Sequence, residues 1–309
     1  MSRSVCVLLV CVLFGASQVS VRAADVKIIQ QDDQLQVKIG DADFATYNYS
    51  PRFPKPFFLP VKAADGTVLT RALNDPEDND HKHHKGIWVA VDEVNGVQHW
   101  AEKGPIVTRD VTVMQTEGPT AAFDVTNEWQ KPESNDPVVT EKTRISIHSN
   151  GLMTYDIRFL AEHGPVEFLD TKEGLLGYRM ASSMKEKNTG RVVGSDGSEG
   201  TAACWGRPLS WIDYSGTVDG RTFGVALMDH PGNFRPSRYH VRNYGLFSIS
   251  PFGERAYTNG KEPAKPVHLK QGEDLRLQYA IYVHQGDVEA GNVKQVWQQF
   301  LDVTRESAE

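Results

Sequence analysis

Apolar and polar residues alternate along much of the chain, and Gly, Pro, Asn and Asp separate the alternating runs. A period of two places successive side chains on opposite faces of a strand, so this pattern predicts β-strands. The predicted strands are residues 35–39, 87–94, 108–115, 121–128, 142–148, 152–160, 166–169, 222–228, 246–250 and 275–283. Turn dipeptides typical of hairpins separate several of them, namely Asn95-Gly96, Asn150-Gly151 and Asp219-Gly220.

One segment near the C-terminus has helical spacing instead. Its apolar residues fall on one helix face and predict a helix that packs on the core: Val293, Val296, Trp297, Phe300 and Leu301. Many antiparallel strands with regular turns, and no internal repeat, are typical of a β-sandwich. We therefore expect an all-β fold, a large antiparallel two-sheet sandwich with a C-terminal helix.

The N-terminal residues have the pattern of a secretory signal peptide. Arg3 precedes a short apolar run, and Val21 and Ala23 are small residues at the two positions that a signal peptidase reads. We expect residues 1–23 to be a cleaved signal peptide and residues 24–309 to be one β-sandwich domain of a periplasmic or secreted protein. The apolar run is shorter than the ~20 residues that a membrane span needs, so we expect no membrane span.

Charge and cysteine content narrow the functional classes. The net charge is −7, and it becomes −9 after cleavage because Arg3 and Arg22 leave with the signal peptide. Nucleic-acid binding relies on Lys and Arg to neutralise phosphates, so an acidic chain of this kind argues against a nucleic-acid partner. Cys204 is the one cysteine of the expected mature chain, which leaves no disulfide partner.

The segment richest in candidate chemistry is Asp80-His81-Lys82-His83-His84-Lys85-Gly86. Histidine changes charge near neutral pH and binds metals when neutral. In an extended chain His81 and His83 would point to one side and His84 to the other, which would pair two imidazoles for a metal site or for holding a sugar. The alternative is a solvated polar loop.

Two further segments hold candidate residues. Glu173 and Arg179 border a short apolar strand, where Glu173 suits a general base or metal ligand and Arg179 suits binding of a hydroxyl or anion. His230, Arg238 and His240 lie on a long polar segment, and such segments often carry binding sites. The alternatives are an internal salt-bridge set in the first case and an exposed crossover in the second.

Ordered motifs give the chain a resemblance to a known family. They are Lys55-Pro56-Phe57-Phe58-Leu59-Pro60-Val61, Asp65-Gly66, Leu69-Thr70-Arg71, the histidine segment running into Ile87-Trp88, Val94-Asn95-Gly96, Lys172-Glu173-Gly174, Trp211-Ile212-Asp213-Tyr214-Ser215-Gly216, Asp229-His230-Pro231 and Asn243-Tyr244-Gly245-Leu246-Phe247. Over residues of about 40 to 285 the chain resembles exported bacterial proteins labelled "PmoA-like" or "methane oxygenase PmoA". The resemblance implies a galactose-mutarotase-like β-sandwich, in which two histidines and a carboxylate act on a sugar in an open groove.

The residues and the resemblance together lead to a working hypothesis: a periplasmic carbohydrate-active enzyme that uses acid/base chemistry on a mono- or oligosaccharide, as a hydrolase, lyase or epimerase. His81, His83 and Glu173 are the expected catalytic residues. The expected substrate-binding residues are His84, Arg71, Trp88, Arg179, His230, Arg238 and His240.

Two other functions stay open. A non-catalytic sugar-binding protein would need aromatic residues such as Trp88 and Trp211, but not the His/Glu set. A metal-dependent oxygenase, as the family label suggests, would need a cofactor, and His81 and His83 are the candidate ligands for a divalent metal.

Overall fold

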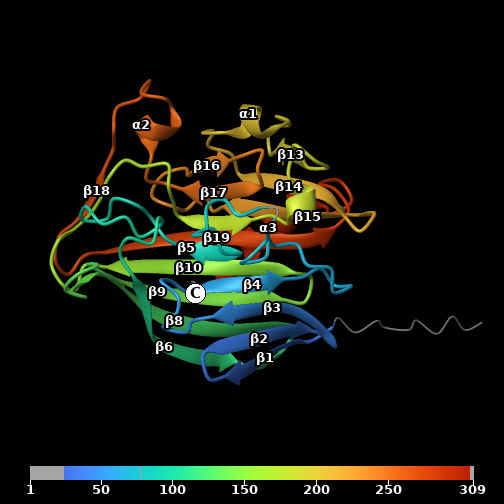
Figure 1. Cartoon of the computed structure of the whole chain (residues 1–309), viewed down its shortest axis with the longest axis horizontal. Helices are drawn as coiled ribbons and strands as arrows, with labels where there is room; N and C mark the ends of the chain where they lie inside the picture. The colour runs from blue at the N-terminus through green and yellow to red at the C-terminus, as the bar shows by residue number, and fades with distance from the viewer. Residues whose placement is uncertain (1–23, 77, 307–309) are drawn as a thin grey trace, which may run out of the picture.

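The computed structural model describes residues 24–76 and 78–306 (Figure 1). The expected signal peptide, residues 1–23, lies outside the described residues. Two large antiparallel sheets face each other and form the sandwich that the alternation pattern predicts. No helix among the described residues is long and apolar enough to cross a membrane.

The first sheet has nine strands in the described part of the chain. In spatial order they are β16 (Arg238–Val241), β17 (Leu246–Ser250), β12 (Leu176–Arg179), β5 (Ile87–Val89), β4 (Phe57–Val61), β3 (Ala42–Asn48), β2 (Gln34–Ile39), β1 (Val26–Gln31) and β7 (Glu117–Gly118).

The second sheet has eight strands over the same described ranges. In spatial order they are β13 (Arg191–Gly194), β14 (Trp211–Val218), β15 (Arg221–Asp229), β19 (Asp274–Gln285), β10 (Leu152–Leu160), β9 (Pro137–His148), β8 (Thr120–Gln130) and β6 (Ile106–Gln115). A two-stranded sheet and short helices complete the fold: β11 (Val166–Phe168), β18 (Val267–Leu269), η1 (Ser182–Met184), α1 (Thr201–Cys204), α2 (Glu254–Tyr257) and α3 (Val293–Glu306).

The inner faces of the two sheets form the main core. Alternate residues of β8 are buried, as its sequence pattern predicts, and among them Phe123 points across the sandwich. Its ring centroid lies 5.2 Å from that of Tyr47 on β3 and 6.2 Å from that of Phe58 on β4. Burying large rings of this kind removes 150–250 Å² of surface each, which makes them leading contributors to stability.

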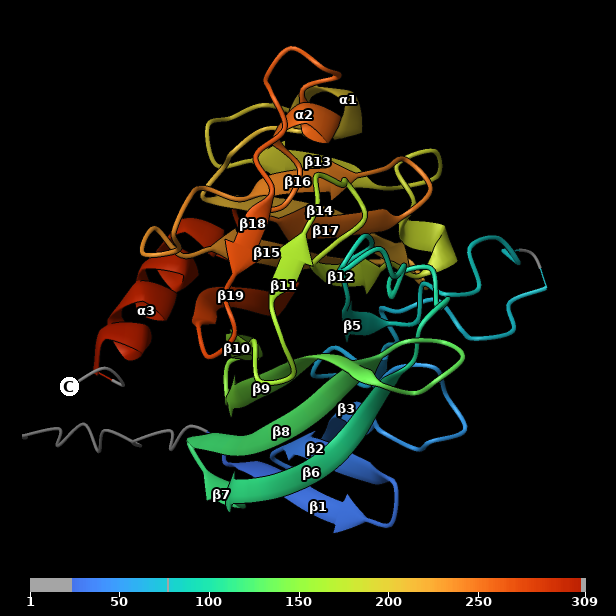
Figure 2. The ribbon, with the colours of Figure 1, turned by 90° about the vertical axis from the view of Figure 1, so that its left-hand side faces the viewer.

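Helix α3 packs against the outer face of the second sheet. Val293, Val296 and Phe300 are buried there in a smaller apolar cluster with Met228 of β15 and Ala280 of β19. In Figure 2, α3 lies on the opposite side of the molecule from the loop that precedes β5. The C-terminal helix is therefore confirmed, and its apolar stripe packs on the sheet.

The sequence pattern missed several elements of the fold. No strand was predicted in residues 185–205 and 229–244, yet these connections contain β13 and β16. Both strands are four residues long, which is too short for a period of two to stand out. The strand expected at 87–94 ends at Val89, and its C-terminal part instead forms a tight turn with a bridge between Val94 and Val97.

Three neighbouring strands bring the candidate segments together. Tyr178 of β12 pairs with Ile87 of β5 on one side and with Phe247 of β17 on the other. The backbone N–H of Asp92 also bonds the carbonyl oxygen of Glu173 at 2.9 Å. The histidine segment, the segment of Glu173 and the β16–β17 hairpin therefore lie at one part of the first sheet.

Candidate active site

The histidine segment is a compact turn, not an extended strand. His81 has a φ of 39°, in the left-handed region, and the N–H of His84 bonds the carbonyl oxygen of His81 at 2.8 Å. The rings of His81 and His84 consequently lie parallel, with centroids 4.9 Å apart. The expectation that His84 points away from His81 is wrong, because it assumed the side-chain alternation of a strand.

A column of four stacked rings forms at this turn, and we call it the ring column. It consists of Tyr244, His81, His84 and Trp88, with successive centroid distances of 5.0, 4.9 and 5.2 Å. Tyr244 and His81 are at least partly exposed, whereas His84 and Trp88 are 3% and 2% exposed. His84 and Trp88 are thus buried beneath His81, and direct substrate binding by them stays a prediction.

Two buried arginines hold the turn in place. Arg71 donates to the carbonyl oxygens of Asp80, His81 and His84 at 2.7, 3.0 and 3.1 Å. Arg179 donates to the carboxylate of Asp80 at 2.5 Å. They are 5% and 0% exposed, and Arg179 forms the internal salt bridges of the alternative interpretation; substrate binding by these arginines stays a prediction.

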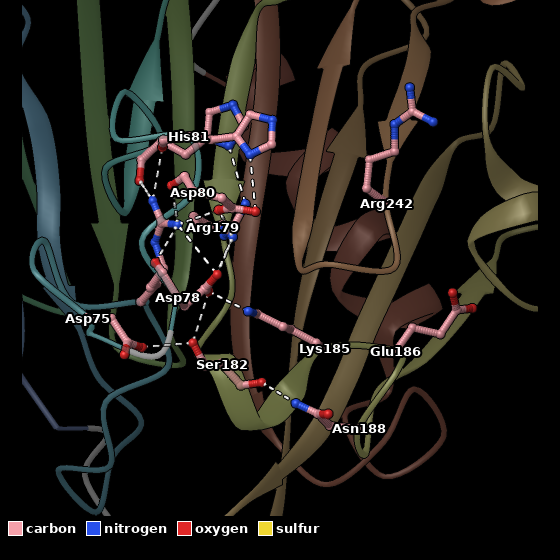
Figure 3. A network of polar contacts seen from close by, with 12 residues as sticks. Asp75, Asp78, Asp80, His81, Arg179, Ser182, Lys185, Glu186, Asn188 and Arg242 are labelled. Atoms are coloured by element: carbon pink, nitrogen blue, oxygen red, sulfur yellow. Dashed lines mark hydrogen bonds and ion pairs between the residues drawn. The ribbon is translucent and has the colours of Figure 1, made fainter.

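Asp78 is the buried centre of this polar network (Figure 3). It accepts hydrogen bonds from Arg179 at 3.1 Å and from Ser182 at 3.0 Å, and it pairs with Lys185 at 2.6 Å. Burial raises the pKa of Asp78, but the bonds from Lys185, Arg179 and Ser182 outweigh it and lower this pKa to about 2. The charged network therefore persists at any moderate pH.

His83 is the histidine of the turn whose ring has no hydrogen bond to the described residues. Its ring is partly exposed, and neither ring nitrogen has a hydrogen-bond partner in residues 24–76 or 78–306. Burial and the positive charge of Lys55 lower the pKa of His83 to about 4, while the charges of Glu102 and Glu173 raise it. His83 is thus neutral near pH 7 and able to accept a proton.

Lys55 anchors the backbone of His83, a role that sequence analysis missed. Its Nζ donates to the carbonyl oxygens of His83 and Trp100 at 2.8 and 3.2 Å and to the Glu102 carboxylate at 2.8 Å. Burial lowers the pKa of Lys55 to about 8. The available signal was a lysine placed directly before an apolar strand, at the start of the motif Lys55-Pro56-Phe57.

Glu173 lies at the surface beside His240. Its side chain is 26% exposed and bonds the ammonium group of its neighbour Lys172. The Nδ1 atom of His240 is 3.6 Å from the Glu173 carboxylate and 3.1 Å from the carbonyl oxygen of Lys172, while its Nε2 atom accepts from Arg242 Nε at 2.9 Å. This arrangement requires the proton on Nδ1, so both nitrogens are occupied.

His240 is buried and uncharged in this arrangement. It is 2% exposed, and burial lowers its pKa to about 4, so it is neutral at pH 7. Direct substrate binding by His240 stays a prediction. Its contacts hold Glu173 and Arg242 on either side of it.

An open pocket of about 550 Å³ adjoins Glu173 through Lys172. Its lining residues are Asp170, Thr171, Lys172, Trp205, Arg242, Ala256 and Asn259. This volume is in the range of pockets that hold small ligands. Trp205 and Arg242 are far apart in the sequence, so no local pattern connects them.

The remaining candidates lie apart from the ring column. His230 contacts Phe300 of α3, with ring centroids 5.4 Å apart, so it belongs to the outer side of the second sheet. Arg238 bonds Glu254 and the carbonyl oxygen of Gly206, at 2.9 and 2.8 Å. These contacts join His230 to α3 and Arg238 to α2, and substrate binding by the two residues stays a prediction.

The metal prediction concerns His81 and His83, whose ring centroids are 5.8 Å apart. Among the described residues, no group of three or more His, Cys, Asp or Glu side chains is arranged to hold a metal ion. Metal binding by this pair stays a prediction that the metal content of the purified protein tests. Cys204 is buried, as expected, and burial raises the pKa of its thiol.

Comparison with known proteins gives a family but no activity. The family described as "Family of unknown function (DUF6807)" matches residues 34–298. No curated protein matches the chain.

Several solved structures of sugar-related proteins align at low identity. Galactose 1-epimerase from Lactobacillus acidophilus NCFM has 10% identity and a TM-score of 0.43, covering 85% of this chain and 98% of that one. A putative aldose 1-epimerase from Escherichia coli K12 has 7% identity and a TM-score of 0.41, covering 84% and 99%. For the GH36 alpha-galactosidase AgaA from Geobacillus stearothermophilus the identity is 8% and the TM-score 0.38, and the chain spans only 41% of its length. At these values the likeness assigns neither substrate nor reaction.

Proposed function

The chain belongs to this family of unknown function (DUF6807), and we propose that it is an exported enzyme that transfers protons on a sugar substrate. In this proposal His83 and Glu173 are the catalytic residues, and His81 lines the site beside them. The observation that carries the proposal is that a histidine with unbonded ring nitrogens and a partly exposed carboxylate lie on segments that the neighbouring strands β5 and β12 bring together.

The surroundings of His83 and Glu173 favour such a role. A neighbouring residue contacts each of them: Lys55 bonds the backbone of His83, and His240 lies against Glu173. A catalytic group needs this kind of rigid support to keep its geometry. Acid/base catalysis by one positioned group typically contributes about 10²- to 10⁴-fold in rate.

Aromatic and polar groups beside the pair support a sugar as the substrate. Tyr244 is partly exposed at the end of the ring column, and Trp205 lines the adjoining pocket. Aromatic faces next to hydrogen-bonding groups suit sugar rings, which present apolar C–H faces and polar hydroxyl edges. Hydrolysis, elimination and epimerisation of sugars all need proton transfer, so each is compatible with this pair.

The test is turnover of a panel of neutral and acidic oligosaccharides by the purified protein. Products are separated by chromatography, and reducing ends are counted. We expect turnover of at least one member, and a loss of at least about 100-fold in His83→Gln and in Glu173→Gln. The control is His268→Gln, at an exposed position on β18, which should retain full turnover.

Two results would overturn the proposal. Full turnover by either catalytic variant would remove His83 or Glu173 from the reaction. Binding of a sugar that no condition converts, with equal affinity in wild type and Glu173→Gln, would instead identify the protein as a non-catalytic sugar-binding protein.

A further inference from the structure

The pocket next to Glu173 contains charged groups of both signs, and most of them are already bound to other parts of the protein. Asp170 accepts from the backbone N–H groups of Arg255 and Ala256 at 3.0 and 2.8 Å. Lys172 bonds Glu173. Asp170 and Lys172 are therefore already paired, and Arg242 is the remaining charged residue of the pocket lining.

Arg242 is held as a preoriented guanidinium fork. Its Nε donates to His240 Nε2 at 2.9 Å, and its guanidinium carbon lies 5.4 Å from the centre of the Trp205 ring. Within residues 24–76 and 78–306, neither terminal nitrogen has a hydrogen bond or an ion pair. Figure 3 shows Arg242 apart from the network around Asp78 and without a bond to the residues drawn.

The other arginines near the site have hydrogen-bond partners for their terminal nitrogens. Arg71 and Arg179 are buried, and their N–H groups donate hydrogen bonds to carbonyl oxygens and carboxylates of the turn. Arg238, on the same hairpin as Arg242, bonds Glu254. Arg242 alone among these four arginines lines the pocket with its terminal nitrogens unpaired.

We propose that the substrate is a carboxylated saccharide, a uronic acid or an oligomer that contains one, and that Arg242 binds its carboxylate. This inference rests on the proposed function and names its substrate class. A planar guanidinium presents two parallel N–H donors that match the two oxygens of a carboxylate. One unpaired guanidinium also matches the single negative charge of a uronate.

The pocket places such a substrate close to Glu173, one of the two proposed catalytic residues. Lys172 both lines the pocket and bonds Glu173, so the two regions are continuous. A sugar whose carboxylate lies on Arg242 has the Trp205 ring beside it and the Glu173 carboxylate within the same open surface. Tyr244, at the partly exposed end of the ring column, is two residues from Arg242 along the chain.

The test is isothermal titration calorimetry of the purified Glu173→Gln protein, in which turnover is blocked. The ligands are oligogalacturonate, the same oligomers with their carboxyl groups reduced to alcohols, and a sulfated neutral oligosaccharide. Charged hydrogen bonds contribute about 1.5–3 kcal/mol, so we expect the uronate to bind about 10- to 100-fold tighter than the reduced oligomer. Arg242→Met should abolish that difference, and higher salt should reduce it.

Two control variants separate charge recognition from a packing defect. Arg242→Lys keeps the charge but loses the fork, so it should retain part of the preference. Arg207→Met, which removes a surface partner of Asp196, should retain all of it. A melting temperature within a few degrees of the parent protein shows that each variant is folded.

The possible results separate this inference from the proposed function. Equal binding of uronate and reduced oligomer, unchanged in Arg242→Met, would overturn the carboxylate site and leave a sugar enzyme in place. Preference for the sulfated sugar would overturn the carboxylate assignment. Binding of no saccharide at all would overturn both proposals.

Discussion

The ring of His81 lies parallel to the ring of Tyr244, with an interplanar angle of 4° and centroids 5.0 Å apart. Tyr244 belongs to the hairpin between β16 and β17, and His81 belongs to the turn before β5. Their contact therefore joins two segments that are far apart in sequence. It also positions the exposed end of the ring column beside the proposed catalytic pair.

This stack predicts a difference between two substitutions of Tyr244. Tyr244→Phe keeps the ring and should leave the free energy of unfolding nearly unchanged. Tyr244→Ala removes it and should cost about 0.5–1.5 kcal/mol beyond the loss of buried area, because aromatic pairs contribute that much. Urea unfolding of both variants measures the difference, and equal stabilities would contradict the stack.

The buried arginine network predicts a larger effect. Arg179→Met should lower the free energy of unfolding by about 3–5 kcal/mol, because it leaves Asp78 and Asp80 without their buried partner. Arg276→Met breaks an exposed pair with Asp156 and should cost about 0–1 kcal/mol. Denaturant midpoints for the two variants provide the comparison, and similar losses would show that the Arg179 network does not stabilise the fold.

Burial of His99 predicts a pH-dependent contribution to stability. Burial lowers the pKa of His99 from 6.5 to about 4, so in that interval the unfolded chain binds a proton that the folded chain does not. The stabilising contribution of neutral His99 is thus present above pH 6.5 and is lost as pH falls towards 4. His99→Gln should be less stable than wild type at pH 7, and this deficit should shrink at pH 4.

Thermal melts of both proteins across this pH range measure the change in the deficit. His99→Gln keeps a donor for the carbonyl oxygen of Gly104, which His99 Nδ1 contacts at 3.2 Å. A deficit that is constant with pH would mean that His99 is not held neutral by burial.

The neutral state of His83 predicts how the rate depends on pH. If His83 accepts a proton, kcat/KM should fall as pH drops through about 4, where the ring becomes protonated. After burial, the charge of Lys55 is the next cause that lowers the pKa of His83. Lys55→Met should therefore shift the acid limb of the profile to higher pH, provided that circular dichroism shows a folded protein. A limb that does not move would exclude this coupling.

The sequence predicted the sandwich because alternation extends over long strands. The hairpin of β9 and β10 is an example: its turn at Gly151 has a φ of 89°, as the Asn-Gly pair indicates. The strand β16 was missed because its four residues are too few to show the two-residue alternation clearly. Length alone does not decide, because β14 has eight residues and was also missed: its first six residues are all buried and show no alternation.

The candidate site was predicted only in part. The sequence identified His83 and Glu173 by residue type, and nothing in the structure tests their assigned roles. The sequence did not show that Arg71 and Arg179 are buried. The local sequence of an arginine in a polar segment is the same whether its side chain faces solvent or buried aspartates. Nor did it join Trp205 to Arg242, since that contact arises only when the first sheet brings their segments together.

The most direct test of the central claim, that His83 and Glu173 act together in one proton-transfer reaction, is a double-mutant comparison of kcat/KM. The proteins are wild type, His83→Gln, Glu173→Gln and the double variant, measured on the sugar that wild type converts. We predict that each single variant loses about 10²- to 10⁴-fold and that the double variant loses little more, because residues that act as a unit are not additive. Wild-type turnover in either folded single variant would contradict the account.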